Sequence, residues 1–150
     1  FLAAPLWLAR ATNKLQSQYT SGASSIAQKA AEAAYTGSQE CVEEMRKAFE
    51  RRRDLVVGLA RTIPGWKVNN PQGAFYLFPE VSSYFGKRYG DTVINNDSDL
   101  AMYLLEEGHV ATVAGSAFCT PGYIRLSYAT SDDNIREAMR RIEAALAKLV

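Results

Sequence analysis

The sequence predicts an α+β fold in which a small mixed or antiparallel sheet carries helices on one face and a long connecting helix precedes it. Apolar residues recur at helical spacing between residues 39 and 63, which indicates that long helix. After Pro64 the spacing of the apolar residues is no longer helical, and short segments that favour strands alternate with helical ones in the order β-β-α-β-β-α. Elements in this order form a sheet with helices packed on one side.

Two shorter helices are expected before the long one. Residues 6–18 form the first, because Pro5 is suited to a first helical turn, and a polar loop follows it. Residues 23–36 are rich in alanine, which favours a helix that packs closely against its neighbours. Gly37 then ends this helix, and Ser38 caps the next one.

The long helix is expected to bury one apolar stripe and to end at Pro64–Gly65. Glutamates lie near its start and arginines lie later, as the helix dipole prefers. Its length is typical of a helix that connects two domains. The stripe consists of Val42, Met45, Phe49, Val56, Leu59 and Ile63.

Four strands are expected after it. Residues 66–68 and 74–78 form two strands joined across the turn-rich link Asn69–Gly73, and residues 80–96 form an irregular loop. Residues 110–113 and 123–128 form the other two, separated by a loop that carries glycines and Pro121.

Two helices complete the domain. Asp97 is expected to cap a helix that runs through Glu107, with Leu100, Tyr103 and Leu104 facing inward. Ser131 is expected to cap the last helix. The buried stripe of the last helix consists of Ile135, Met139, Ile142, Leu146 and Leu149.

Composition excludes several classes of function. The 17 basic and 16 acidic residues give a net charge of +1, so nothing favours nucleic acid or an anionic membrane as a partner. No apolar run reaches the roughly 20 residues that span a bilayer. Two cysteines and a single histidine, His109, make neither a metal site nor a disulfide framework, and a reducing, cytoplasmic location is expected.

Arg125 is the most informative residue. In the segment Tyr123–Tyr128 alternation places Ile124, Leu126 and Tyr128 on one face of a strand and Arg125 on the other. An arginine there is costly to bury unless it is paired, and its planar fork suits a carboxylate in bidentate geometry. A structural arginine, bonded to a local acid or exposed on the sheet, is the alternative.

Taken together, two segments resemble the C-terminal domain of fold-type-I aminotransferases of the aspartate type. These are Gly73–Pro79 (GAFYLFP) and Val110–Ser131 (VATVAGSAFCTPGYIRLSYATS). Family members commonly show Gly-x-Phe-Tyr, then a Pro-Gly-x-x-Phe-Gly loop, then Arg-x-Ser-x-Ala. Ala114 stands here where proline is usual, and Cys119 stands where glycine is usual.

The resemblance implies a role for several residues. Arg125 would hold the α-carboxylate of the substrate, and Phe75 would lie near the substrate. Tyr19 and Thr20 match a loop that approaches the neighbouring subunit's site, which implies a homodimer. Residues 1–37 would be a remnant of the large cofactor-binding domain, and residues 38–150 would be the small domain.

The same resemblance implies pyridoxal phosphate as the cofactor of an intact parent enzyme that moves an amino group between an amino acid, aspartate or a similar one, and a 2-keto acid. The family's Schiff-base lysine lies in a Ser-x-x-Lys segment that is absent here. We therefore expect no catalytic residue in this chain, no cofactor bound to it, no metal, and no activity of the chain alone. An N-terminus that begins at Phe1–Trp7, in mid-strand and without methionine, is typical of a fragment or of a processed product.

Two alternatives stay open at the level of sequence. Another fold-type-I enzyme, such as a carbon–sulfur lyase or a decarboxylating synthase, also needs the carboxylate-binding arginine. A non-catalytic α+β domain that binds a small molecule would need only the fold.

Overall fold

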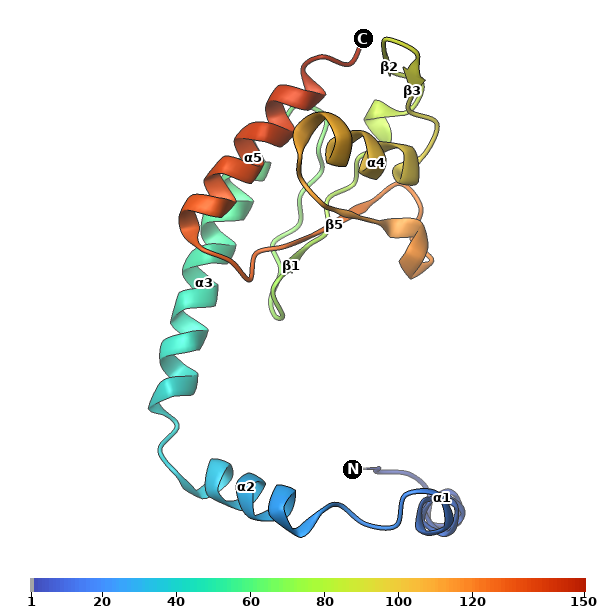
Figure 1. Ribbon diagram of the computed structural model, residues 1–150, viewed down its shortest axis with the longest axis vertical. Helices are drawn as coiled ribbons and strands as arrows, with labels where there is room; N and C mark the ends of the chain where they lie inside the picture. Colours follow the sequence, from blue (N-terminus) through green and yellow to red (C-terminus); the bar gives the residue numbers. More distant parts are fainter. Residues whose placement is uncertain (1) are drawn as a thin grey trace. The chain divides into compact units, whose positions relative to one another are not determined.

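A computed structural model describes residues 2–150, and Phe1 lies outside the described residues. The chain divides into two compact units, and the boundary between them along the sequence lies between Glu43 and Glu44. The first unit holds α1 (Leu6–Tyr19), α2 (Ser25–Thr36) and the start of α3 (Glu40–Ala60). Gly37 follows α2 as predicted, and Pro5 stands at the N-cap of α1, one position before the first turn in which it was expected. Neither α1 nor α2 buries a residue. Both helices are labelled in Figure 1.

The long helix α3 buries only its C-terminal part. Val56, Val57 and Ala60 are buried, whereas Val42 and Met45, which the sequence placed in the buried stripe, are 57% and 60% exposed. The predicted burial of the apolar stripe is therefore correct for the second half of the helix and wrong for the first half. The physical reason is that the core lies against the second half only, together with Ile63 beyond the helix end.

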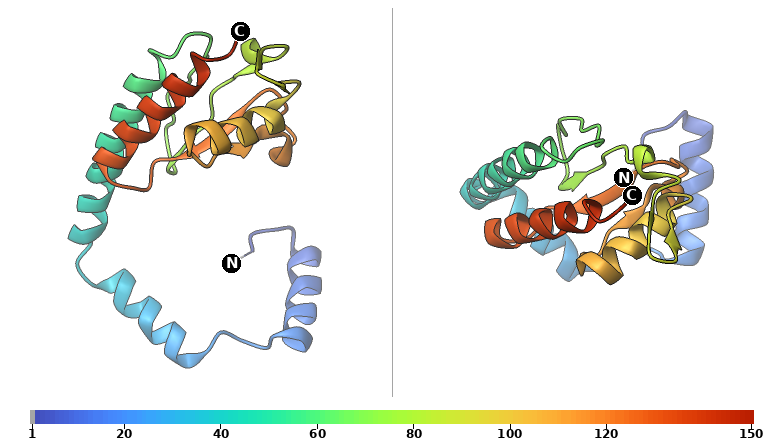
Figure 2. Two further views of the ribbon diagram at one scale, coloured as in Figure 1. Left: turned by 45° about the horizontal axis from the view of Figure 1, so that its top comes forward. Right: turned by 90° about the horizontal axis from the view of Figure 1, so that it is seen from above.

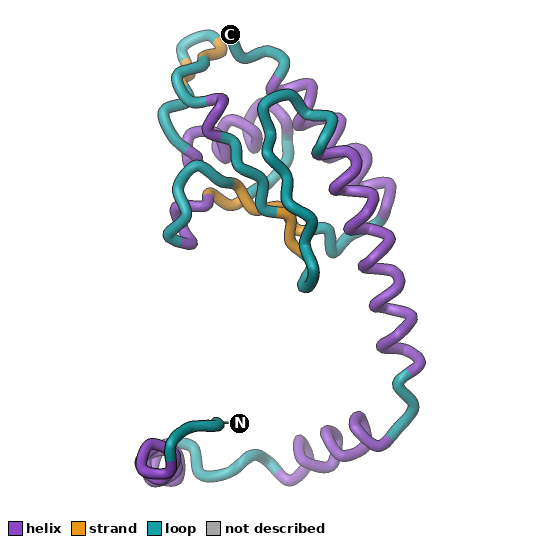
Figure 3. The backbone as a smooth tube through the Cα atoms, turned by 180° about the vertical axis from the view of Figure 1, so that it is seen from behind, coloured by secondary structure: helices purple, strands orange, loops and turns teal. Residues whose placement is uncertain are grey.

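The second unit contains a three-stranded antiparallel sheet of very short strands. Its order is β1 (Tyr76–Leu77), β5 (Ile124–Ser127) and β4 (Val113–Ala114), so that β5 is central. Leu77 pairs with Leu126, and Val113 pairs with Arg125. Single bridges from Glu80 to Lys67 and to Tyr123 extend the sheet. Figure 3 shows the same strands from behind.

Two expectations about the strands are wrong. Residues 66–68 form no strand, since only Lys67 bridges to Glu80. The stretch 80–96 is not wholly irregular, because it holds the 3-10 turn η1 (Ser82–Tyr84) and the hairpin of β2 (Arg88–Tyr89) and β3 (Thr92–Val93). Gly90, which has φ +58°, permits the two-residue turn of this hairpin.

Helices α4 (Asp97–Gly108) and α5 (Asp132–Leu146) pack against each other and complete the core. Every residue that the sequence assigned inward on these two helices is buried, although Leu149 lies beyond the end of α5 at Leu146. Ser131 caps α5 as predicted, but Asn96 rather than Asp97 caps α4, by accepting a hydrogen bond from the Asp99 amide at 2.9 Å. Asp97 is instead the first residue of the helix.

Helices α3 and α5 lie side by side (Figure 2). Arg51 and Arg52 of α3 both contact the carboxylate of Asp132, at 3.1 and 3.7 Å. Within residues 2–150, no helix is both long and apolar enough to cross a membrane.

Candidate functional site

The open face of the sheet carries the residue that the sequence singled out. On β5, Ile124 and Leu126 are buried, Arg125 is half-buried and Ser127 is exposed. The predicted alternation is therefore confirmed, because the apolar side chains enter the core and Arg125 lies on the opposite face.

Arg125 lies between two aromatic rings. Its Cζ atom is 4.4 Å from the ring centroid of Tyr76 on β1 and 4.3 Å from that of Phe118 in the 3-10 turn η2 (Gly115–Phe118). These rings come from elements on either side of β5, since β1 and β4, which η2 follows, are its two neighbours in the sheet. A cation over an aromatic face is stabilised by the ring quadrupole, and the N–H groups at the guanidinium edge remain able to donate to a ligand.

No carboxylate within residues 2–150 lies within ion-pair distance of Arg125. The structural alternative, a salt bridge to a local acid, is therefore not formed by the described part of the chain. A guanidinium held by rings, with its donors unclaimed by local acids, has the geometry required to bind the carboxylate of a small molecule. That role stays a prediction.

Phe75 lies next to this group. Its ring centroid is 4.6 Å from that of Tyr76 and 5.8 Å from that of Phe49, and the side chain is 38% exposed. Tyr76 therefore joins the two predicted substrate-binding residues, Phe75 and Arg125, into one aromatic and cationic surface. Phe75 also lines an open pocket of about 380 Å³ beside α3.

The backbone before Phe75 is strained. Ala74 has φ +57°, a conformation that L residues other than glycine rarely adopt. The Tyr128 hydroxyl donates to the Ala74 carbonyl at 3.1 Å, and the Tyr128 amide donates to the Phe75 carbonyl at 2.9 Å. These two bonds hold the turn that presents Phe75, and burial raises the pKa of the Tyr128 hydroxyl.

The turn η2 is fastened at two points. A Cβ at Gly115 would lie 2.2 Å from the Thr120 carbonyl oxygen, so glycine is required there. Asp97 accepts hydrogen bonds from the amide and the hydroxyl of Ser116, at 2.6 and 2.7 Å. Burial raises the pKa of the Asp97 carboxyl, but bonds from Ser116 and nearby backbone groups outweigh it and lower the pKa.

Sequence reasoning missed Tyr76 and Phe118 as neighbours of Arg125, and Asp97 as the anchor of η2. Asp97 was taken for a helix cap. The Phe-Tyr pair after Gly73 and the aromatic residue in the 114–122 loop were visible, but nothing local placed their rings against Arg125.

Tyr19 and Thr20 lie at the end of α1 in the first unit. Tyr19 is 81% exposed, as a residue that contacts another subunit must be before association, and the Gln16 side chain donates to the Thr20 hydroxyl. Their role at a partner's site stays a prediction.

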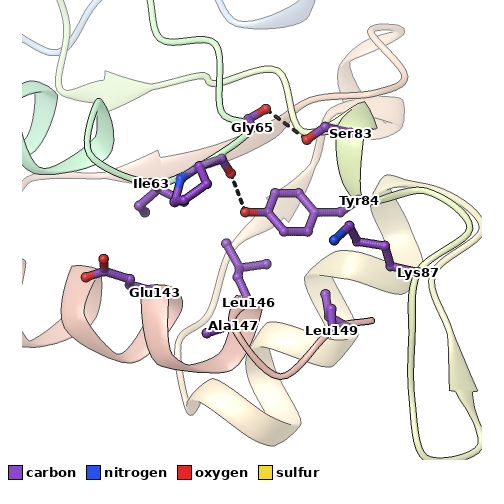
Figure 4. Close-up of a pocket in the computed structure, with 10 residues that line it drawn as sticks. Ile63, Gly65, Ser83, Tyr84, Lys87, Glu143, Leu146, Ala147 and Leu149 are labelled. Atoms are coloured by element: carbon purple, nitrogen blue, oxygen red, sulfur yellow. Dashed lines mark hydrogen bonds between the residues drawn. The ribbon is translucent and has the colours of Figure 1, made fainter.

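A second pocket, of about 420 Å³, lies between the end of α5 and the residues after α3 (Figure 4). Two of its hydroxyl groups are bonded within the chain, since the Tyr84 hydroxyl donates to the Pro64 carbonyl and the Ser83 hydroxyl donates to the Gly65 carbonyl; Lys87 and Glu143 also line the pocket. Among residues 2–150 no cluster of three or more histidine, cysteine or acidic side chains could hold a metal ion.

The fold matches part of a solved aminotransferase. The sequence model of the family "Aminotransferase class I and II" matches residues 1–142, and the chain belongs to this family.

Its relatives carry aspartate-related names. An aspartate/prephenate aminotransferase of Cereibacter sphaeroides is 46% identical over 99% of this chain and 38% of its own length. An aspartate aminotransferase of Pinus pinaster is 47% identical, over 99% of this chain and 31% of its own length. The crystal structure of the aspartate aminotransferase from Rhizobium meliloti superposes with a TM-score of 0.90 at 42% identity, covering 99% of this chain and 37% of that one. The chain thus spans about a third of the length of the relatives it matches.

Proposed function

We propose that this chain provides the substrate-clamping small domain of an aspartate-type aminotransferase, within a longer protein that moves an amino group between an amino acid and a 2-keto acid. The observation that carries the proposal is the Arg125 guanidinium, held between Tyr76 and Phe118 with no carboxylate partner among residues 2–150. The family match over residues 1–142 favours this reading over a non-catalytic domain.

In this proposal Arg125 binds the α-carboxylate of the substrate through two parallel N–H···O bonds. Fixing the carboxylate orients the substrate's Cα–H bond, which is a positioning effect. Phe75 packs against the rest of the substrate. Residues 38–150 act as the small domain that closes over the substrate and excludes water, and α3 is the arm that connects them to residues 1–37.

The family implies pyridoxal phosphate, which acts as an electron sink when it is bound. Residues 1–150 contain no Ser-x-x-Lys segment of the kind that carries the Schiff-base lysine in the family. Two of the lysines, Lys67 and Lys148, form ion pairs with Glu80 and Glu107. We therefore propose that residues of the longer protein other than 1–150 hold the cofactor.

The partners belong to the same proposal. The names of the relatives suggest aspartate and prephenate as substrates, and the family suggests a homodimer in which Tyr19 and Thr20 approach the neighbouring subunit's site. The free, exposed cysteines Cys41 and Cys119 are compatible with a reducing, cytoplasmic location.

Replacing Arg125 in the longer protein tests the proposal. Arg125→Ala should lower kcat/KM for the amino-acid substrate at least about 100-fold, because a desolvated charged pair is commonly worth about 2–5 kcal/mol. Arg125→Lys should recover only part of the loss, since an ammonium lacks the planar fork. Steady-state kinetics measures both, and unchanged kinetics in the alanine variant would show that Arg125 is structural or peripheral.

The chain of 150 residues, taken alone, should form no stable imine with pyridoxal phosphate. Incubation with the cofactor followed by borohydride reduction should leave no stoichiometric phosphopyridoxyl adduct at any one of its lysines. Peptide mass mapping reads the result, and full labelling of a single lysine would overturn the assignment of the cofactor to other residues.

A further inference from the structure

Asp97 is a buried acid that the proposed binding of substrate does not use. It is 1% exposed, and it is the one charged side chain among the buried residues of the described chain. A buried carboxylate is costly unless hydrogen bonds compensate it, so what it bonds to indicates what it does.

Capping of α4 does not explain this carboxylate. Asn96 already caps the helix by accepting from the Asp99 amide, and Asp99 in turn accepts from the amide and the side chain of Asn95. Asp97 instead directs both carboxylate oxygens at Ser116, one to its amide at 2.6 Å and one to its hydroxyl at 2.7 Å. Two such charge-assisted bonds fix both the backbone and the side chain of Ser116.

Ser116 lies in the same short turn as Phe118. The base of this turn is closed by the Gly115 amide, which donates to the Tyr123 carbonyl at 2.7 Å, and by the Thr120 amide, which donates to the Gly115 carbonyl at 3.0 Å. Asp97 fastens its other side. The position of the turn determines where the Phe118 ring stands, and that ring is 4.3 Å from the Cζ atom of Arg125.

We propose that Asp97 is a positioning residue for Arg125, which acts through Ser116 and the Phe118 ring. Its effect on substrate rests on the proposed function, whereas its effect on the geometry of Arg125 does not. With the turn fastened, Tyr76 and Phe118 limit the rotamers of the arginine. With the turn released, Arg125 samples conformations in which its fork no longer meets a carboxylate, and binding weakens more than the chemical step does.

The first experiment observes Arg125 directly in the 150-residue chain. Rings packed on a guanidinium shift the NMR signals of its Hε and Hδ protons upfield. Asp97→Asn places an NH2 group where the carboxylate had an acceptor, and Ser116→Ala removes the hydroxyl donor. Both variants should move the Arg125 signals toward free-arginine values. Ser116→Thr, which keeps a hydroxyl, and Asp99→Asn, a matched change on the same helix, should leave them in place.

Ser116→Ala tests the proposal even if Asp97→Asn does not fold, because it retains Asp97 and its bond to the Ser116 amide. In that case the comparison of the Arg125 signals between Ser116→Ala and Ser116→Thr tests the proposal. Unmoved Arg125 signals in a folded Ser116→Ala variant would then overturn the proposal.

The second experiment uses the longer enzyme. Asp97→Asn and Ser116→Ala should raise KM for the amino-acid substrate about tenfold or more while kcat changes much less, and Asp99→Asn should resemble the parent. If Arg125→Ala weakens catalysis but neither variant changes KM, the positioning role is wrong. If Arg125→Ala itself has no effect, the proposed function fails, and the NMR result alone decides about Asp97.

Discussion

Cys119 has a backbone conformation that favours glycine. It follows the turn η2 with φ +56°, and aminotransferases that the sequence resembles commonly carry glycine there. A left-handed conformation costs an L residue roughly 1–2 kcal/mol, and glycine avoids this cost. Glycine is also more flexible in the unfolded chain, which lowers the stability of the folded state by about 0.4–1 kcal/mol and so offsets part of the benefit.

Cys119→Gly should therefore raise the free energy of unfolding by up to about 1.5 kcal/mol. Ala117→Gly in the same turn, where φ is not positive, is the matched control and should lower it by about 0.5–1 kcal/mol. The urea concentration at the midpoint of unfolding measures the change in stability of both variants. A destabilising effect of both changes would show that the backbone at Cys119 is not strained.

At the scale of single residues, the sequence located Arg125 but not its surroundings. Alternation along one strand is a local property, so Ile124, Leu126 and Arg125 could be assigned to their faces from the sequence. The rings of Tyr76 and Phe118 reach Arg125 through the register of β1 against β5 and the path of η2, which depend on contacts far apart in the chain.

On the scale of elements, α5 carries the clearest electrostatic feature. Glu137 accepts hydrogen bonds from Arg140 at 2.8 Å and from Arg141 at 2.7 Å. These bonds and the positive charges lower the pKa of Glu137 from 4.5 to about 2. A depressed pKa means that the unfolded chain takes up the proton first, so acidification favours unfolding.

The stability that Glu137 contributes should be complete above pH 4.5 and should disappear as the pH falls to about 2. Glu137→Gln should therefore have a lower Tm than the parent at pH 7 and the same Tm near pH 2. The effect is small because the group is exposed. Glu143→Gln, at a position on α5 without an ion pair in residues 2–150, is the control, and a Tm difference at Glu137 that is independent of pH would contradict the prediction.

The elements that the sequence predicted best are those whose formation is local. The helices α1, α2, α4 and α5 follow from periodicity, alanine content and caps within their own segments. The strands are only two to four residues long, and their bounds are set by pairing rather than by propensity, so 66–68 was wrongly taken for a strand and the β2–β3 hairpin was missed. The first half of α3 shows the same limit, because periodicity indicates an apolar face but not what covers it.

At the scale of the whole molecule, the two units differ in what they bury. The second unit holds the entire cluster of buried apolar residues, from Val56 to Leu149. The helices α1 and α2 bury none, and their large apolar side chains are exposed. These side chains are Leu6, Trp7, Leu8, Leu15, Tyr19, Ile26 and Tyr35. Large apolar side chains exposed in this number on two helices favour association with another surface.

The 150-residue chain should therefore self-associate through its first unit, and its two tryptophans can report where. Trp7 is 71% exposed, and Trp66 is 8% exposed with an indole N–H that has no hydrogen-bond partner among residues 2–150. In a Trp66→Phe variant, which loses no hydrogen bond, the emission of Trp7 should shift to the blue as the concentration rises. The Trp7→Phe variant is the matched control, and its Trp66 emission should not depend on concentration.

Light scattering should give a mass above 16.5 kDa, and removal of residues 1–37 should return the mass to that of a monomer. A monomeric full chain whose Trp7 emission is already blue-shifted at the lowest concentration would instead show that α1 covers its apolar side chains within one molecule.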